Sequence, residues 1–234
     1  MSPDVVLGIA ALTWFGIHPL VAGSKLRAVL VQKLGDRGYQ SAFSLLSIAS
    51  LTFLIWAYRK APCDPLWITP RPLYFLPLVA VPLAFVFLVG AFTVPNPMAV
   101  AGEKALAGDD PARGMQRVTR HPFLWAVILW SGSHLIVNGN VPALLFFGSL
   151  FLTAAIGTRD IDQKRLRSDP EGFRRYATLT SNLPFLAIAS GKNRLKLREL
   201  VVPIVVGLIL AAALLHFHQS WFGLSALRAL DFAR

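Results

Sequence analysis

The sequence has few charged residues and little cysteine. Lys, Arg, Asp and Glu make up 15% of the 234 residues, against about 25% in a typical soluble domain. Cys63 is the only cysteine, which excludes an intrachain disulfide, a Cys-x-x-Cys redox pair and covalent attachment of a c-type haem. The first four residues carry no Lys or Arg. This start lacks the basic residues of a signal peptide, so we expect a retained first span.

Hydrophobic residues, in contrast, make up 55% of the chain, and the mean hydropathy is +0.56. A helix needs about 20 mostly apolar residues to cross a bilayer, and a lipid-exposed backbone must satisfy its own hydrogen bonds. The sequence therefore predicts an all-α, polytopic integral membrane helical bundle, with residues 1–234 as a single membrane domain. The six predicted spans are residues 4–23, 40–58, 72–94, 120–137, 141–157 and 199–217.

Two local signals refine this plan. Pro77 and Pro82 predict kinks in the third span, and Asn138-Gly139-Asn140 predicts a tight helical hairpin between the fourth and fifth spans. The first part of the long segment 158–198, from Arg159 to Tyr176, is expected to continue the fifth span as a charged helix.

Lys and Arg are distributed unevenly along the chain. Eighteen of the 23 lie in segments 24–39, 95–120 and 158–198, which alternate with sparsely charged connections. By the positive-inside rule, these three segments are cytoplasmic and both termini are periplasmic. Topology and contact with anionic lipids account for the net charge of +11. No zinc-finger or RNA-binding motif accompanies it, which argues against nucleic acid as a partner.

Asp and Glu are almost absent from the predicted spans, so histidine is the titratable side chain at membrane depth. His18 precedes Pro19 and fits two interpretations: a hydrogen bond to a carbonyl that the proline frees, or an axial ligand of haem iron. Ser131 and His134 share one face of the fourth span, where hydrogen bonding between helices is the alternative to a cofactor contact.

The other polar positions lie near the ends of spans. Arg120 and His121 precede Pro122 at the cytoplasmic mouth of the fourth span, as an anion site at a helix N-terminus or as an interfacial anchor. His216 and His218 lie at the outward end of the last span, where we expect interfacial positions. They are two residues apart and do not share a helix face.

Several polar and aromatic motifs occur in a fixed order along the chain. They are Gly16–Leu20, Arg117–Pro122, Trp130–His134, Asn138–Asn140, Asp160–Lys164, Phe173, Tyr176, Thr178 and Pro184–Phe185. Together they resemble the NnrU family, which includes bacterial membrane proteins associated with denitrification and is related to the 15-cis-zeta-carotene isomerases of plants and cyanobacteria.

The resemblance implies a haem b cofactor with His18 and His134 as metal ligands. The candidate cofactor-binding residues are His18, His134, His121, Arg120 and Ser131. Ser131 stands where the isomerases have a cysteine, so a thiolate ligand is not available at this position. Depth favours another pair, because His18 lies roughly 8 Å and His134 roughly 21 Å from the cytoplasmic ends of their predicted spans. His121 matches the depth of His18 better and is the alternative ligand.

For function, the resemblance implies either support of nitrite or nitric oxide reduction, or haem-dependent cis–trans isomerisation of a polyene. It also implies the bacterial inner membrane as the location. The expected partners are membrane lipids, a lipophilic small molecule or nitric oxide, and a respiratory reductase.

A weaker resemblance leaves a second enzyme class open. Arg120-His121-Pro122, followed by a helical hairpin and by Asp160 and Asp162, resembles the isoprenylcysteine and phospholipid methyltransferases. This implies S-adenosylmethionine near Arg120, His121, Asp162 and Tyr176. A third hypothesis is a non-enzymatic assembly factor for a respiratory reductase.

Overall fold

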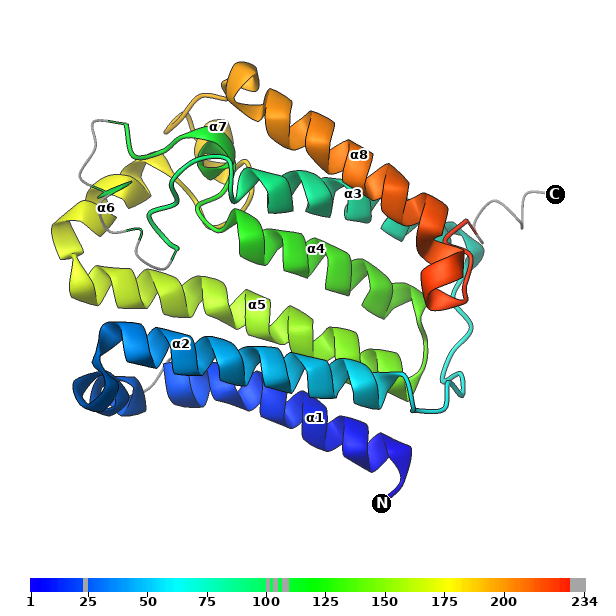
Figure 1. Ribbon diagram of the computed structural model, residues 1–234. Helices are drawn as coiled ribbons and strands as arrows, with labels where there is room; N and C mark the ends of the chain where they lie inside the picture. Colours follow the sequence, from blue (N-terminus) through cyan, green and yellow to red (C-terminus); the bar gives the residue numbers. More distant parts are fainter. Residues whose placement is uncertain (23–24, 100–101, 103–104, 107–109, 228–234) are drawn as a thin grey trace. The chain divides into compact units, whose positions relative to one another are not determined.

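The computed structural model describes residues 1–22, 25–99, 102, 105–106 and 110–227. Three quarters of the chain is helical, and the described residues contain no β-strand. Figure 1 shows long helices and, between α3 (Phe75–Gly90) and α4 (Pro122–Val137), a long connection whose described residues form no long helix. The expected all-α class is therefore confirmed.

Five helices are long and apolar enough to cross a membrane, and a sixth apolar helix is shorter. The five are Pro3–Ala22, Leu26–Tyr58, Arg71–Gly90, Val141–Ser168 and Leu197–Phe222, and the shorter one is Pro122–Val137. Each of the six predicted spans overlaps one of these helices. The chain has the architecture of a helical membrane protein.

The helices fall into two compact units, and each unit combines two stretches of the chain. Unit 1 contains Met1–Thr69 and His134–Thr153, and unit 2 contains Pro70–Ser133 and Ala154–Arg234. The expectation of a single membrane domain stays a prediction.

Unit 1 is built on two helices that pack together, α1 (Pro3–Ile17) and α2 (Lys25–Tyr58). α1 continues into a π-helix, η1 (His18–Ala22). Pro19 has no N–H to donate, which interrupts the regular hydrogen-bond ladder at this point. α2 breaks at Gly35, whose φ of 71° costs glycine little because it has no Cβ. The chain around these two irregularities therefore departs from a straight span.

The turn between α4 (Pro122–Val137) and α5 (Val141–Ser168) falls on Asn138–Asn140, as predicted. The Asn140 side chain accepts a hydrogen bond from the Ala143 N–H at 2.8 Å and so caps α5. A Cβ on Gly139 would lie 2.6 Å from the backbone oxygen of Trp67, in the segment that follows α2. Only glycine fits at this position.

Unit 2 contains a close pair of helices, α3 (Phe75–Gly90) and α8 (Leu197–Phe222). Gly207 of α8 lies against the backbone of Val86 in α3, where an added Cβ would come within 2.7 Å. The core beside this contact contains Phe87, Met115, Val118, Ala126 and Leu200.

α5 continues beyond the apolar part of its sequence into the charged segment, as expected, and ends at Ser168. Asp169 then caps α6 (Pro170–Leu179) by accepting a hydrogen bond from the Gly172 N–H at 2.9 Å. The charged helix predicted from Arg159 to Tyr176 is thus two helices, because Pro170 favours a new helix start. A short helix, α7 (Leu186–Ala189), precedes α8.

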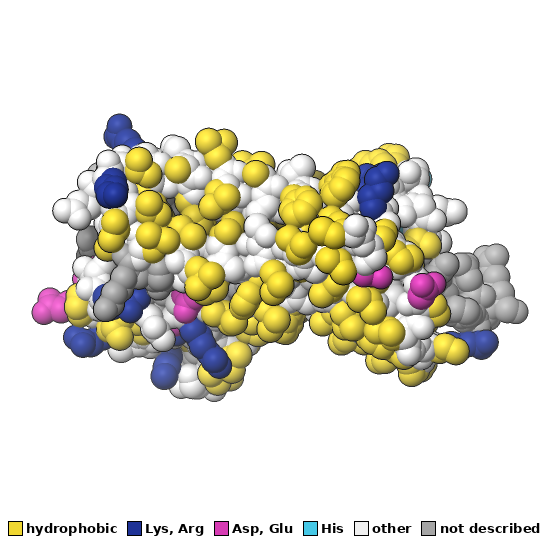
Figure 2. Space-filling view, turned by 90° about the horizontal axis from the view of Figure 1, so that it is seen from below, with side chains coloured by type: hydrophobic (Ala, Val, Ile, Leu, Met, Phe, Trp, Pro, Cys, Tyr) yellow, Lys and Arg dark blue, Asp and Glu magenta, His cyan; other side chains and the backbone are white. Residues whose placement is uncertain are grey.

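Figure 2 shows one face of the molecule in space-filling form. Hydrophobic side chains cover much of the middle of this view, and most Lys and Arg side chains lie towards its left end. Large exposed side chains on α8 are likewise apolar, among them Val201, Val205 and Ile209. Apolar exposure on this scale fits contact with lipid rather than water.

Candidate functional site

His18 occupies the first position of the π-helix η1, in unit 1. Its Nδ1 lies 2.8 Å from the carbonyl oxygen of Trp14. The backbone N–H of His18 bonds the Phe15 carbonyl instead, which leaves the Trp14 carbonyl to the side chain. A carbonyl accepts only, so Nδ1 carries the proton and Nε2 carries the lone pair. Nε2 has no hydrogen-bond partner among the described residues.

Aromatic rings surround this histidine. The Trp14 ring centroid lies 4.6 Å from the imidazole, and the Phe43 ring meets it edge-on at 5.7 Å. Tyr39 stacks on Phe43 at 6.0 Å. The half-buried imidazole therefore lies in a largely apolar environment, with one nitrogen fixed and the other available.

His134 also belongs to unit 1, but its neighbours lie elsewhere along the length of α2. Its ring stacks on Phe147 at 5.0 Å, and Phe147 in turn contacts Tyr58 at 5.9 Å. Tyr58 is the last residue of α2, whereas Phe43, the neighbour of His18, precedes it by fifteen positions, about 22 Å along a helix. The neighbours of the two histidines therefore belong to, or contact, distant parts of α2. This agrees with the depth difference that the sequence indicates.

Ser131 is fully buried and donates its hydroxyl hydrogen bond to the Val127 carbonyl, 2.6 Å away on the same helix. The hydroxyl thus bonds within α4, where the sequence had suggested a bond between helices. Back-bonding of this kind satisfies a serine in an apolar environment without a second helix.

Arg120 and His121, in unit 2, share one carboxylate. The Arg120 Nε lies 2.9 Å from both oxygens of Asp162, and its Nη2 lies 2.6 Å from Oδ2. The His121 Nε2 lies 2.8 Å from Oδ1. The guanidinium also lies over the Phe173 ring, with its Cζ 5.9 Å from the centroid. This cluster brings together three of the residues that the methyltransferase resemblance implies, counting Asp162.

The fourth such residue, Tyr176, is completely buried in α6. Burial raises the pKa of its phenol far above the usual value, so the hydroxyl stays protonated. Both oxygens of Asp162 are already bonded to Arg120 and His121, and the cluster is internally neutralised. The geometry is that of a structural ion pair that holds the start of α4, which weakens the case for a nucleotide site there.

The backbone around this cluster is also bonded to the segment after α6. The Arg120 N–H donates to the Ser181 carbonyl at 3.0 Å, and the Thr119 hydroxyl donates to the Asn182 carbonyl at 2.5 Å. The Trp125 indole N–H donates to the same Asn182 carbonyl at 2.8 Å. The loop before α4 is therefore held by hydrogen bonds from several directions.

A second ion cluster, centred on Arg117, did not follow from sequence reasoning. Its Nε donates to Glu199 at 2.8 Å, its Nη1 to Asn193 at 3.0 Å and its Nη2 to Asp110 at 2.6 Å. Although partial burial opposes ionisation, the Arg117 and Lys196 charges hold the pKa of Asp110 below its usual value. The available signal was the place of Arg117 in the Arg117–Pro122 motif, but its partners lie up to 82 positions away.

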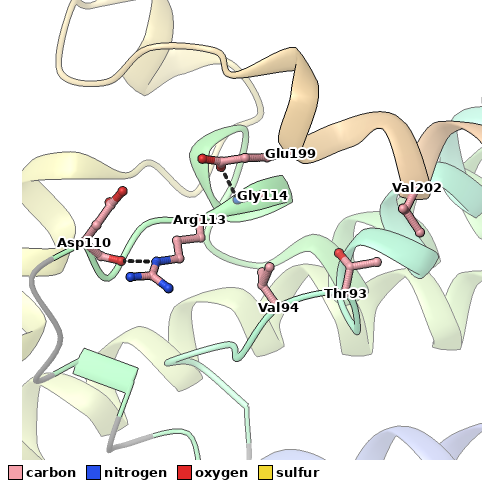
Figure 3. A pocket seen from close by; sticks show the side chains of 7 residues that line it. All are labelled: Thr93, Val94, Asp110, Arg113, Gly114, Glu199 and Val202. Atoms are coloured by element: carbon pink, nitrogen blue, oxygen red, sulfur yellow. Dashed lines mark hydrogen bonds between the residues drawn. The ribbon is translucent and has the colours of Figure 1, made fainter.

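A pocket of about 530 Å³ lies beside this cluster. Figure 3 shows Thr93 and Val94 after α3, Val202 on α8, and the polar side chains of Asp110, Arg113 and Glu199. Glu199 accepts a hydrogen bond from the Gly114 N–H at 2.7 Å, and the Arg113 Nε donates to the Asp110 carbonyl at 3.1 Å. These bonds fix the local backbone, and we assign no ligand to the pocket.

The remaining histidines lie near the end of α8. His216 is exposed, and the His218 Nδ1 lies 2.7 Å from the Leu224 carbonyl. Across the described part of the chain, no group of three or more His, Cys, Asp or Glu side chains could hold a metal ion. A haem iron requires only one or two axial ligands, so the isolated His18 remains a suitable candidate.

The fold and these clusters define a helical membrane protein in which the first span holds a histidine, with its tautomer fixed, at the start of a π-helix. Comparison with known proteins identifies the family. The NnrU protein family profile matches residues 6–226, and the chain belongs to this family. The chloroplastic 15-cis-zeta-carotene isomerase of Zea mays is 30% identical to it over 82 residues. That match covers 35% of this chain and 22% of the maize protein. No solved structure matches the chain.

Proposed function

We propose that this NnrU-family protein binds haem b through the Nε2 of His18 and isomerises a cis double bond of a lipid-soluble polyene. The hydrogen bond between His18 Nδ1 and the Trp14 carbonyl carries the proposal. Haem-ligating histidines are commonly oriented by such a bond, which fixes the tautomer and makes the other nitrogen more basic. The π-helix at His18 adds support, because this rare conformation is enriched at functional sites.

His18 is the residue that would hold the iron. When bound, the haem would supply an electron-rich or Lewis-acidic metal centre that lowers the barrier to rotation about a double bond. The chain's contribution is to present a neutral imidazole, and the rings of Trp14 and Phe43 keep water from it. The family and the name of the maize relative support isomerase chemistry.

The neighbour of His134, Phe147, contacts α2 at Tyr58, about 22 Å along the helix from Phe43, so His18 alone would hold the iron from unit 1. A haem held by one histidine would also be able to bind nitric oxide, which is consistent with a role in nitrite or nitric oxide reduction beside a respiratory reductase. The Lys and Arg distribution supports an orientation with both termini on the periplasmic side, if the protein lies in the bacterial inner membrane as the resemblance implies.

The experiment that tests this function begins with the spectrum of protein purified from haem-competent cells. We expect a Soret band that shifts on reduction and disappears in His18→Gly. Added imidazole should restore the band in this variant, because the free base replaces the lost side chain. His216→Gly, an exposed histidine, is the matched control and should keep a normal spectrum.

Isomerisation is then measured by chromatography of a cis-polyene incubated with the reduced protein in liposomes. Colourless wild-type protein after haem supplementation would overturn haem binding. Haem-loaded protein that leaves every cis-polyene unchanged but co-purifies with a reductase would favour a supporting role in denitrification over isomerase activity.

A further inference from the structure

Two buried polar groups close to His18 have no hydrogen-bond partner within the part of the chain that the structure describes. They are the indole Nε1 of Trp14 and the hydroxyl of Tyr39. Tyr39 is only 6% exposed, so water does not readily replace the missing partner. Leaving such a group unpaired is unfavourable, because its interaction with water is lost and not replaced. Two unpaired donors near one histidine favour a ligand whose polar group accepts hydrogen bonds from them.

A positive charge lies beside the same tyrosine. The Arg27 Cζ is 5.4 Å from the centroid of the Tyr39 ring. Among the described residues, Arg27 has no carboxylate partner. A half-buried guanidinium without a counter-ion, next to two unpaired donors, favours an anionic group.

The position of this group relative to His18 follows from ring contacts. The centroid of the Phe43 ring lies 5.7 Å from that of His18 and 6.0 Å from that of Tyr39. The available Nε2 and the donors of Arg27 and Tyr39 therefore border one aromatic cluster. The π-helix η1 and the kink at Gly35 lie on the two chain segments that form this cluster.

We infer that Arg27, Tyr39 and Trp14 form an anion-binding site that takes a carboxylate of the porphyrin ligated by His18. The inference rests on the proposed haem binding and adds the residues that orient the cofactor. A lipid phosphate offers similar chemistry, and the test separates the two sources. The three donors make charge-assisted hydrogen bonds to the carboxylate, and the imidazole binds the metal.

The test compares two cofactors that differ only at the carboxylates. Apoprotein in phosphatidylcholine nanodiscs is titrated with haem b and with its dimethyl ester, and binding is followed by Soret absorbance. Wild-type protein should bind haem b at least about tenfold more tightly than the ester, since a charge-assisted hydrogen bond contributes this much. Arg27→Gln and Tyr39→Phe should lose this preference while keeping the ester affinity and the Soret position.

Arg37→Gln provides the control, because Arg37 is an exposed arginine on the same helix. It should retain the full preference for haem b. Equal affinity of the wild-type protein for haem b and ester would overturn the carboxylate site and leave haem ligation by His18 intact. Variants that lose haem and ester alike would show a structural role for Arg27 and Tyr39, which also overturns it. If neither cofactor binds, the proposed function itself fails.

A lipid phosphate as the true occupant gives another result. In that case phosphatidic acid in the nanodiscs would protect the Tyr39 and Arg27 side chains from chemical modification to the same extent with and without haem. The protein would then bind haem b no more tightly than its dimethyl ester.

Discussion

Arg120 and Asp162 form a two-pronged ion pair at the start of α4, with N–O distances of 2.6 and 2.9 Å. Their side chains are 14% and 17% exposed, so neither charge is well solvated. Such a pair stabilises little against an apolar alternative, but removing one partner leaves a charge stranded.

Asp162→Asn keeps the shape of the side chain and removes its charge. We expect the free energy of unfolding to fall by about 3 kcal/mol, because Arg120 loses its counter-ion in a poorly solvated position. Thermal unfolding in detergent, followed by circular dichroism, measures the change. Asp160→Asn, two residues earlier on the same helix, should have little effect.

The double variant Arg120→Met with Asp162→Leu checks the mechanism. It should be more stable than Asp162→Asn, because no charge is left stranded. If the loss of unfolding free energy in the double variant equalled the sum of the losses in Arg120→Met and Asp162→Leu, the ion-pair explanation would be contradicted.

Arg117→Lys should be destabilising although the charge is kept. The guanidinium reaches Glu199, Asn193 and Asp110 at once, whereas a lysine ammonium is a point charge that cannot span these acceptors. We expect a loss of about 2 kcal/mol in unfolding free energy. Arg113→Lys is the comparison, because Arg113 is exposed and bonds one backbone carbonyl. Equal effects of the two substitutions would count against this account.

Replacing glycine with alanine should have opposite effects on stability at two positions. Gly207→Ala places a Cβ 2.7 Å from the Val86 backbone, so α3 and α8 must separate, at a cost of about 2 kcal/mol. Gly148→Ala meets nothing within 4 Å and should stabilise α5 by up to about 1 kcal/mol. Unfolding in detergent measures both, and a loss of stability at position 148 would be the unexpected result.

The apolar stretches of the sequence were sufficient to locate the long helices, because hydrophobic length is a local property. The start of α2 was missed. Residues 24–39 contain four basic side chains and two glycines, which indicated a connection, yet α2 begins at Lys25. Gly35 does interrupt the helix, as its positive φ shows. The glycine signal was therefore real, but it marked a break within a helix and not a loop.

Some contacts of the candidate sites could likewise be predicted from the sequence, and others could not. That His18 would bond a carbonyl near Pro19 could be foreseen, although the acceptor is Trp14. The Arg117–Glu199 ion pair could not be foreseen, because its members are 82 positions apart and no spacing rule relates them. Trp14 and Tyr39 could not be foreseen for another reason: an aromatic side chain beside apolar residues usually serves packing, and only the structure identifies an unpaired polar atom.

Of His18, His121 and His134, only His18 should affect the haem spectrum. The His134 ring contacts Phe147, near the Tyr58 end of α2, about 22 Å along this helix from Phe43, the neighbour of His18. His134→Ala should therefore leave the Soret position and the haem stoichiometry unchanged. His121→Ala should also leave the spectrum unchanged, because the His121 Nε2 is bonded to Asp162.

Only His18→Ala should remove the haem, because it deletes the imidazole whose second nitrogen is fixed by Trp14. Absorbance and electron paramagnetic resonance of the three variants distinguish the cases, since loss of one axial ligand changes the spin state of the iron. A change of spin state in His134→Ala would show that His134 ligates the same iron as His18. The two histidines would then have to reach a common level of α2 in the haem-bound protein, as the resemblance to the isomerases implies. A change in His121→Ala alone would instead assign the iron to the Arg120–Asp162 cluster, and the site at His18 would be disproved.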